Sequence, residues 1–189
     1  HTDFAKQTEQ VLDYLYEQNH RQIAFIGGEI RTVDLNGQKQ YLLADVRTTA
    51  YENWMTIHGL SDNIQIKTGD WTMGFALNAT NALIEASGDQ LPTAIISASD
   101  PMSIGIYRAL QLKNIDIPET ISVFSFDDIE MAGFMSPPLS TVHIDSLEIG
   151  RVAVRLAKER ISDGRKTALR VEVASEIIVR DSVRKNKLS

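Results

Sequence analysis

The chain has 189 residues, and its 19 lysines and arginines against 25 aspartates and glutamates give a net charge of −6, which argues against this chain alone holding a nucleic-acid backbone. Its 43% hydrophobic and 23% charged residues are typical of globular proteins and exclude a disordered tail or a fibrous repeat. The absence of cysteine excludes zinc-thiolate sites, iron–sulfur clusters, thiol nucleophiles and disulfides, and it is compatible with a reducing compartment.

The chain begins at His1 rather than at a methionine, which suggests a fragment or a processed product. Its first residues lack the charged-then-apolar pattern of a secretory signal. No stretch approaches the roughly 20 apolar residues of a membrane span, so we expect no membrane partner. Apolar residues at helical spacing predict a first helix from Thr2 to a left-handed stop at Asn19.

Short apolar strands and helices then alternate. The predicted strands are 22–27, 64–67, 93–97 and 121–126, and the predicted helices are 46–57, 75–86 and 100–114. The polar segment 29–42, with Asn36-Gly37 as a turn signal, is interpreted as an exposed loop. This alternation predicts an α/β protein with right-handed βαβ units and a parallel, doubly wound sheet.

The pattern changes after Phe134. The proline pair 137–138 predicts an extended link, which a strand at 141–145 follows. A helix is predicted at 147–164 and a long last strand at 171–179. The long last strand would expose an edge unless it is paired, so we expect domain swapping or association. The charged tail 180–189 has no apolar period and is expected to be frayed.

The residues that follow the predicted strands indicate the kind of ligand, because ligands bind beyond the carboxyl ends of the strands in an open parallel sheet. These positions carry backbone amides, an indole, a hydroxyl and carboxylates, at Gly27-Gly28, Asp70-Trp71, Ser99-Asp100 and Asp127-Asp128. Carboxylates accept hydrogen bonds from pairs of hydroxyls, and an indole stacks on the apolar face of a sugar ring. The rim therefore suits a neutral, polyhydroxylated ligand, whereas its acidic positions would repel phosphate.

Each of these residues has a purely structural alternative. Ser99 or Asp100 is predicted to cap the helix that has Pro101 in its first turn, and an aspartate in that place is more often a cap than a ligand contact. Trp71 could simply cover the sheet edge, and residues 127–128 could simply form the turn that ends a strand. Arg47 lies near the start of a helix, away from its apolar stripe, where by itself it would be a solvated charge.

Catalytic motifs are absent from the sequence. Phosphate-binding glycine loops, zinc-protease helices and nucleophile elbows have no matching pattern. The adjacent acids Asp127 and Asp128 cannot easily act on one bond from opposite sides, which argues against a glycosidase pair. We therefore expect no catalytic residue, no metal and no cofactor, and a protein that is not an enzyme.

Five segments occur in a fixed order along almost the whole chain. They are NHRQIAFIGG (19–28), LPTAII (91–96) leading to Ser99-Asp100, ISVFSFDD (121–128) after Ile117-Pro118, PPLSTV (137–142) and EIIVRDS (176–182). In this order they resemble the effector-binding region of the LacI/GalR family of bacterial transcriptional repressors. The segment DVRTTAY (45–51) additionally resembles the branch that regulates galactose and β-galactoside genes.

The resemblance implies a domain organisation. Members of the family carry an N-terminal helix-turn-helix, a hinge and two periplasmic-binding-protein-like (type I) lobes joined by three crossovers. By this resemblance, residues 1–143 form the C-terminal-type lobe, and residues 144–189 hold a helix and a strand that return to the N-terminal-type lobe, plus the charged tail. The DNA-binding headpiece and most of the first lobe are absent, so the basic charge would lie elsewhere.

The resemblance also implies the ligand-binding residues. Arg47 matches the family arginine that reaches sugar or purine ligands, and Asp127 matches the aspartate that binds ligand hydroxyls. Trp71 matches an aromatic residue that stacks on the ligand in sugar-responsive members, while Ser99 stands where many sugar-binding members have an asparagine. Asp100 stays a helix cap with ligand contact as the alternative. The predicted ligand-binding residues are Arg47, Trp71, Ser99, Asp100 and Asp127.

We therefore expect the ligand-sensing part of a cytoplasmic, homodimeric repressor. It would bind a sugar effector, galactose or a galactoside, between lobes, and operator DNA through the absent N-terminal helix-turn-helix. An extracytoplasmic sugar-binding protein of a transporter shares the fold and is the first alternative, which the sequence before His1 would distinguish. An enzyme of doubly wound fold is the second.

Overall fold

The computed structural model describes residues 1–33, 40–88 and 90–187, so the predicted turn at Asn36-Gly37 lies outside the described residues. The helices are α1 (Phe4–Glu17), α2 (Val46–Ile57), α3 (Met73–Ser87), α4 (Asp100–Leu112) and α5 (Ser146–Ser162), with the short 3-10 helices η1 (Ser61–Asn63) and η2 (Glu130–Phe134). The strands are β1 (Ile23–Val33), β2 (Gln40–Ala44), β3 (Gln65–Gly69), β4 (Ala94–Ser97), β5 (Ser122–Asp127), β6 (Ser140–His143) and β7 (Glu176–Ile178).

The sheet is built from parallel strands in the order β3-β1-β4-β5-β6, with β7 added antiparallel to β6. The first half of β1 pairs with β3 on one side and β4 on the other, and its second half pairs antiparallel with β2. From β1 the chain therefore goes to β3 on one side, then crosses to β4 on the other. The predicted parallel, doubly wound sheet is confirmed, and its direction reverses between β1 and β4.

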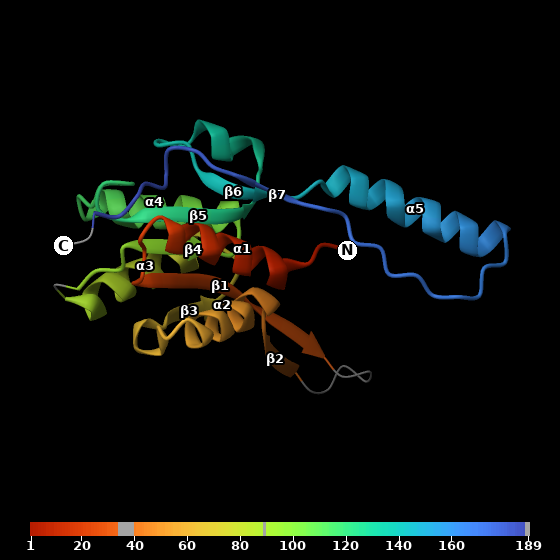
Figure 1. The fold of residues 1–189 in the computed structure, drawn as a ribbon, viewed down its shortest axis with the longest axis horizontal. Helices are drawn as coiled ribbons and strands as arrows, with labels where there is room; N and C mark the ends of the chain where they lie inside the picture. Colours follow the sequence, from red (N-terminus) through yellow and green to blue (C-terminus); the bar gives the residue numbers. More distant parts are fainter. Residues whose placement is uncertain (34–39, 89, 188–189) are drawn as a thin grey trace.

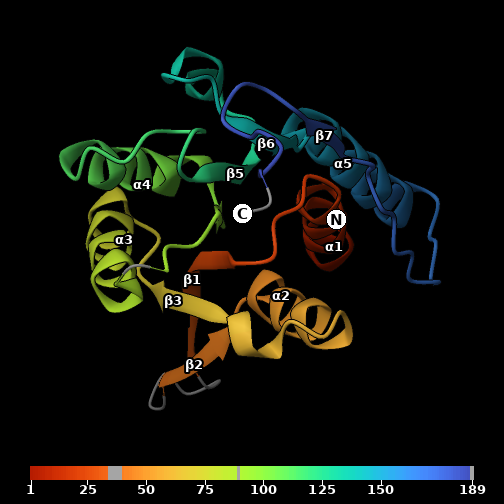
Figure 2. The same cartoon turned by 60° about the vertical axis from the view of Figure 1, so that its left-hand side comes forward.

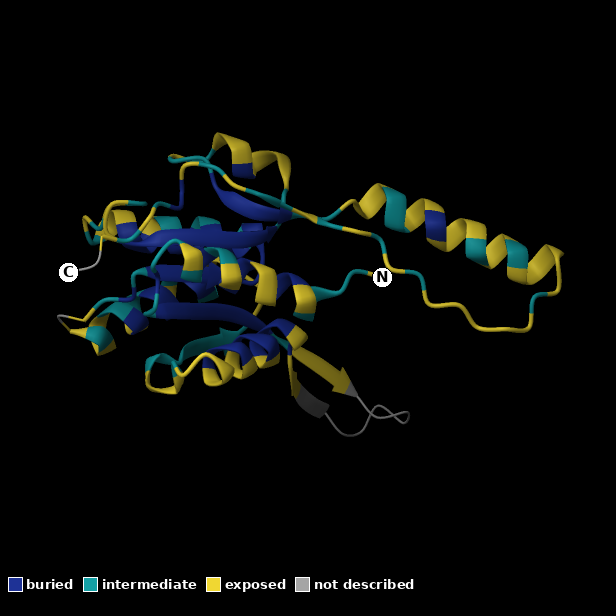
Figure 3. Ribbon diagram, in the orientation of Figure 1, coloured by how far each residue is buried: buried dark blue, intermediate teal, exposed yellow. Residues whose placement is uncertain are grey.

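Helices cover both faces of this sheet, with α1 and α2 on one face and α3 and α4 on the other (Figure 2). Two apolar cores result, because alternate strand residues point to opposite faces. On β1, Phe25 packs with Leu12 and Tyr51 on one side, while Ile26 packs with Met102 on the other. Strands β4 and β5 and the first half of β1 are buried (Figure 3). Burying each such large side chain stabilises the fold by about 1.5–3 kcal/mol.

The helix ends follow the local sequence signals. Asp3, Thr72 and Asp145 each accept a hydrogen bond from a first-turn N–H and so cap α1, α3 and α5. Asn19 (φ 65°) and Gly59 (φ 71°) take up the left-handed conformation just beyond α1 and α2. Both predicted stops are confirmed.

Helices α3 and α4 approach each other closely at a glycine. A Cβ atom added to Gly105 would lie 2.1 Å from the Met73 carbonyl oxygen. Only a residue without a side chain fits there, because the obstacle is backbone that cannot turn away.

The predicted loop at 29–42 is wrong at both ends. Strand β1 continues to Val33, where its residues pair in register with β2, from Glu29 opposite Ala44 to Val33 opposite Gln40. In this two-stranded ribbon, Ile30 and Leu43 are 40% and 51% exposed, and Arg31 and Thr32 are exposed too. A ribbon exposed on both faces needs no apolar alternation, so the sequence carries no strand pattern there.

Two expectations for the end of the chain are also corrected. The predicted long strand 171–179 is paired only over Glu176–Ile178, and it pairs with β6, so it is not the unpaired strand from which domain swapping was expected. The described part of the tail, 180–187, is anchored rather than frayed. Ser182 is fully buried, where its Oγ donates to the Val123 carbonyl (2.6 Å) and accepts from the Ser140 amide (2.7 Å).

Helix α5 extends away from the sheet (Figure 1). It buries only Val152, whereas Leu147, Val154 and Ile161 are 64%, 70% and 83% exposed. The strand that follows it, β7, returns to the sheet formed by the first part of the chain. Of the predicted unit 144–189, α5 and the segment after it project, while β7 and the tail do not. The assignment of this unit to a second lobe stays a prediction.

Candidate functional site

The predicted site residues lie at one edge of the sheet, beyond the carboxyl ends of β1, β3, β4 and β5. Gly28 lies on β1 at the level where β3 ends, Trp71 follows β3, Ser99 follows β4 and Asp127 ends β5. The reversal of strand order between β1 and β4 opens this edge. Such a switch point is where ligands bind in doubly wound sheets.

Arg47 is buried at this edge, only 6% exposed, and its guanidinium is held from two sides. Nε and Nη2 donate to the two carboxylate oxygens of Asp45 at 2.6 and 3.1 Å, and Nη1 donates to the Ala98 carbonyl oxygen at 2.7 Å. Asp45 also caps α2 by accepting from the Arg47 amide at 3.0 Å. Arg47 is therefore a buried, paired charge, and its interpretation as a solvated charge is wrong.

Three aromatic rings surround the Arg47 guanidinium. Its Cζ lies 4.4 Å from the ring centroid of Phe4, 4.9 Å from that of Trp71 and 5.6 Å from that of Phe126. Each distance is within the range of an attractive cation–π contact. Arginine has five N–H donors, and the bonds to Asp45 and Ala98 use three of them among the described residues. The side chain is thus fixed in position with donors left for a ligand.

Trp71 lies against the middle of β1, at Gly28. A Cβ atom added to Gly28 would come within 1.9 Å of the indole Cε2, so only glycine leaves room for the ring. The indole N–H donates to the Glu29 carbonyl oxygen (3.0 Å), and the adjacent Asp70 pairs with Arg31 (2.8 Å). Trp71 covers the sheet edge and yet keeps 38% of its surface exposed. The structural role that the sequence left open is therefore present, and the stacking of a ligand on the exposed part of the ring stays a prediction.

Asp127 is half-buried near Arg47, on a backbone with φ of 113°. Burial raises the pKa of its carboxyl from 3.8 to about 6, and the negative charge of Asp100 adds to this shift, whereas Arg47 opposes it. The Asp100 backbone N–H donates to the carboxylate. Near neutral pH the Asp127 carboxyl group is therefore mostly ionised, half-buried and able to accept hydrogen bonds.

Asp100 has a different surrounding from the one expected. Its side chain is fully buried, where Oδ2 accepts from the Ile129 amide (2.9 Å) and Oδ1 accepts from the Thr141 hydroxyl (2.8 Å). Ser99, not Asp100, is the N-cap of α4, and its side chain makes no capping bond among the described residues. Asp100 thus ties β6 and the segment after β5 to α4, and Ser99 lies beside the Arg47 acceptor Ala98.

A family model described as a periplasmic binding protein-like domain matches residues 12–183. The chain belongs to this family. Membership of this family explains both the ordered sequence motifs and the parallel sheet of the structure.

Curated relatives of this periplasmic-binding-protein-like chain are regulators. The HTH-type transcriptional regulators GanR of Bacillus subtilis (strain 168) and GalR of Lacticaseibacillus casei are 35% and 34% identical to it, each over 96% of the chain and 54% of the relative. The HTH-type transcriptional repressor PurR of Vibrio atlanticus (strain LGP32) is 35% identical over 90% of the chain and 48% of the relative. The chain spans about half the length of the curated relatives it matches.

Solved structures agree with the resemblance to LacI/GalR regulators. A sugar-binding transcriptional regulator of the LacI family from Escherichia coli, complexed with phosphate, superposes with a TM-score of 0.76 at 26% identity, over 98% of this chain and 63% of that one. The similarity to LacI-family regulators expected from the ordered motifs is confirmed.

Sequence reasoning missed several residues of this periplasmic-binding-protein-like site. Asp45 precedes Arg47 by two residues, and this spacing at a helix start was the available signal for a cap that also binds the guanidinium. Phe4 and Phe126 were counted as apolar helix and strand residues, since nothing local distinguishes a ring that packs on a cation.

The described residues contain no group of three or more histidines, aspartates and glutamates arranged to hold a metal ion. Nor is any helix in the described part of the chain long and apolar enough to cross a membrane.

Proposed function

We propose that this chain is the effector-sensing region of a LacI/GalR-type repressor and that its effector is a neutral sugar. The observation that carries the proposal is the meeting of three groups at the switch point of the sheet. These are the caged guanidinium of Arg47, the partly exposed indole of Trp71 and the half-buried carboxylate of Asp127.

Each group suits a different part of a sugar. The free donors of Arg47 fit the lone pairs of ring or hydroxyl oxygens, and the Asp127 carboxylate accepts from two neighbouring hydroxyls. The apolar face of the ring stacks on Trp71. Sugar binding at this edge removes little exposed charge from water, because the Arg47 guanidinium is already buried and paired with Asp45.

The charge of the site argues for a neutral effector. Asp45 neutralises Arg47, and Asp127 and Asp100 add two further carboxyl groups. A phosphorylated sugar would meet net negative charge, which repels it at close range.

Galactose and galactosides are the first candidates. The segment 45–51 resembles the galactose and β-galactoside branch, and the regulators GanR and GalR are among the relatives. A purine is the second candidate, since the repressor PurR is a relative of similar identity. Purines have no row of neighbouring hydroxyls for Asp127, so the site favours a sugar.

The sugar would act by changing the balance between two arrangements of the repressor. An effector shifts such a balance only if it binds one arrangement more tightly than the other. In the proposal, operator DNA is bound in the cytoplasm by a helix-turn-helix in another part of the protein, and no reaction is catalysed. The exposed apolar stripe of α5 packs against the remainder of the N-terminal-type lobe.

Isothermal titration calorimetry on the full-length protein tests the sugar assignment. We expect heat of binding with galactose, lactose or allolactose and none with guanine, and Asp127→Ala should remove the heat. The matched control, Asp62→Ala, replaces an exposed acid of η1 and should leave binding unchanged. No heat with any of the three sugars would reject the galactoside assignment, and heat with guanine alone would make the effector a purine.

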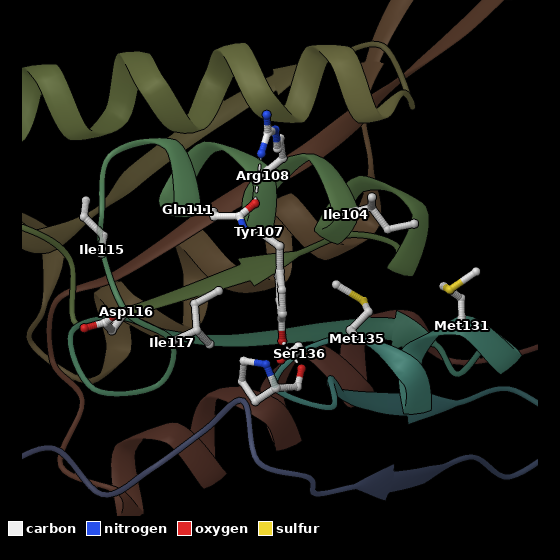
Figure 4. Close-up of a pocket in the computed structure, with 11 residues that line it drawn as sticks. Ile104, Tyr107, Arg108, Gln111, Ile115, Asp116, Ile117, Met131, Met135 and Ser136 are labelled. Atoms are coloured by element: carbon white, nitrogen blue, oxygen red, sulfur yellow. Dashed lines mark hydrogen bonds between the residues drawn. The ribbon is translucent and has the colours of Figure 1, made fainter.

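We also propose that the protein is a homodimer joined through a groove beside α4 (Figure 4). The groove has a volume of about 670 Å³ and a largely apolar lining: Ile104, Tyr107, Arg108, Gln111, Ile115, Asp116, Ile117, Met131, Met135, Ser136 and Pro137. Around it, Leu112, Met131 and Phe134 are 55%, 54% and 78% exposed. Exposed methionine and aromatic side chains with an arginine are enriched where proteins associate.

A further inference from the structure

The turn that presents Asp127 has an unusual backbone. Asp127 and Asp128 both have positive φ, 113° and 54°, in regions that side-chain-bearing residues seldom occupy. Two such residues in succession persist only where the surrounding structure holds them. The question is which contacts hold this turn.

The strongest contacts are made by the Asp128 carboxylate. Oδ1 accepts from Arg180 Nη2 at 2.6 Å, and Oδ2 lies 2.9 Å from Nδ1 of His143. The side chains of Asp128 and Arg180 are 16% and 24% exposed, so this pair is largely removed from water. A charge-assisted bond in such a place is stronger than one at the surface.

Arg180 is itself fixed to the sheet. Its Nη1 donates to the Leu139 carbonyl oxygen at 2.8 Å. Its backbone N–H donates to the Ser140 hydroxyl (2.9 Å), and its carbonyl oxygen accepts from that hydroxyl (3.1 Å). Arg180, in the tail that follows β7, thus holds its guanidinium in a fixed position beside Asp128 in the turn after β5.

Asp128 is therefore bound by two side chains of the protein, Arg180 and His143. Each of its carboxylate oxygens has a partner within the chain, whereas the Asp127 carboxylate, beside Arg47, accepts from the Asp100 backbone N–H. The two adjacent aspartates, of which the resemblance assigned only Asp127 to the ligand, have different surroundings. Asp127 faces the site and Asp128 faces the tail.

We propose that Asp128 is a positioning residue of the effector site, clamped by Arg180 and His143 so that the turn directs the Asp127 carboxylate toward Arg47. This proposal rests on the proposed function, because it assigns a role in sugar binding to residues that do not touch the sugar. Without the clamp the turn relaxes toward ordinary backbone angles, and Asp127 loses its fixed place.

Arg180→Gln in the full-length protein tests the clamp by titration with galactose and lactose. We expect affinity to fall about tenfold or more, the size of effect that loss of a hydrogen bond between charged groups produces. Arg180→Lys keeps the charge beside Asp128 and should recover part of the affinity. Arg184→Gln is the matched control, because Arg184 anchors the same tail to the Glu119 carbonyl oxygen and does not contact Asp128. Wild-type affinity in Arg180→Gln would overturn the proposal, as would equal weakening in Arg184→Gln.

Hydrogen exchange without sugar gives a second test that does not depend on the effector. The amides of residues 127–130 should exchange faster in Arg180→Gln than in the wild type or in Arg184→Gln. If the wild type binds neither sugar, the sugar assignment fails, and this exchange still decides the clamp. Equal exchange in all three proteins would show that the turn holds its shape without Arg180.

Discussion

Arg47 carries a charge that is almost completely buried, and the carboxylate of Asp45 compensates for the loss of water around it. The side chains of this pair are 8% and 7% exposed, and both carboxylate oxygens contact the guanidinium. Removing one partner of a buried pair is strongly destabilising, because the remaining charge has no partner and little water. The proposed ligand-binding arginine therefore also contributes, through Asp45, to the stability of the fold.

Asp45→Asn should lower the free energy of unfolding by about 3 kcal/mol or more, because it leaves the Arg47 charge unpaired while keeping a capping side chain. Urea unfolding of the full-length protein measures the change. Asp145→Asn, which alters the cap of the exposed helix α5, should cost less than about 1 kcal/mol. Equal losses in the two variants would mean that the ion pair adds nothing beyond a helix cap.

Asp127→Asn should make the protein more stable near pH 7.5 while weakening sugar binding. The pKa of Asp127 is raised from 3.8 to about 6 by burial, so between those values the folded state holds the proton more tightly than the unfolded state. This group's contribution to stability therefore falls as pH rises through that window, and ionised Asp127 opposes folding above it.

Thermal unfolding between pH 4 and pH 8 measures this linkage. The stability gained by Asp127→Asn should be largest above pH 6 and should shrink toward pH 4, where the wild-type carboxyl is protonated. If Asp127→Asn gave a stability gain that is independent of pH, or no gain at neutral pH, the site would not destabilise the ionised form of Asp127.

At the scale of elements, the buried parts of the fold were predictable and the polar connections were not. Continuous apolar runs such as 23–26 signalled strands buried on both faces, and Asn19 and Gly59 signalled helix ends. The β1–β2 ribbon was missed because both its faces meet water and impose no pattern. The tail was missed because hydrogen bonds of Arg180 and Ser182, rather than apolar contacts, hold it to the sheet.

The same limit applies to the site. Residue types at the strand ends indicated the edge and the ligand class, because topology brings those ends together. The resemblance predicted Asp127 as the ligand-binding acid, but the surroundings of Asp100 and Asp128 were not predictable. Asp100 is buried by contacts to residues 29 and 41 positions further along the chain, and Asp128 is bound by a residue 52 positions further on. Long-range partners of this kind leave no local sequence signal.

Gly105→Ala should lower the free energy of unfolding by about 1–3 kcal/mol, because a methyl group cannot fit against the Met73 backbone and α3 and α4 must separate. Gly74→Ala is the matched control in the partner helix, where an added Cβ meets nothing within 4 Å. That variant should be neutral or slightly stabilising. Chemical unfolding of both variants measures the difference, and a tolerated Gly105→Ala would contradict the close helix contact.

At the scale of the whole molecule, the two faces of the sheet have different surroundings. The α4 side carries the apolar groove and the exposed Met131 and Phe134, whereas on the α2 side Val46 and Ile57 are exposed at the two ends of the helix. Helix α5, beyond the end of the sheet, offers a third apolar surface (Figure 1). In the proposed homodimer, the groove beside α4 is the interface.

Met131→Asp should convert the full-length protein from dimer to monomer, since a charge would be buried at the centre of the proposed interface. Sedimentation velocity gives the mass directly. Ile57→Asp, equally polar but 81% exposed on α2, should leave the dimer intact. A monomeric wild type, or a Met131→Asp variant that stays dimeric, would remove the groove from the interface.

A crystal structure of the full-length protein grown with galactose or lactose tests the sugar site most directly. We predict a sugar ring stacked on Trp71, with hydroxyls hydrogen-bonded to the Arg47 guanidinium and to the Asp127 carboxylate, and with Asp128 still bound to Arg180. A sugar bound in the α4 groove or elsewhere, with Arg47, Trp71 and Asp127 free of it, would contradict the proposed site.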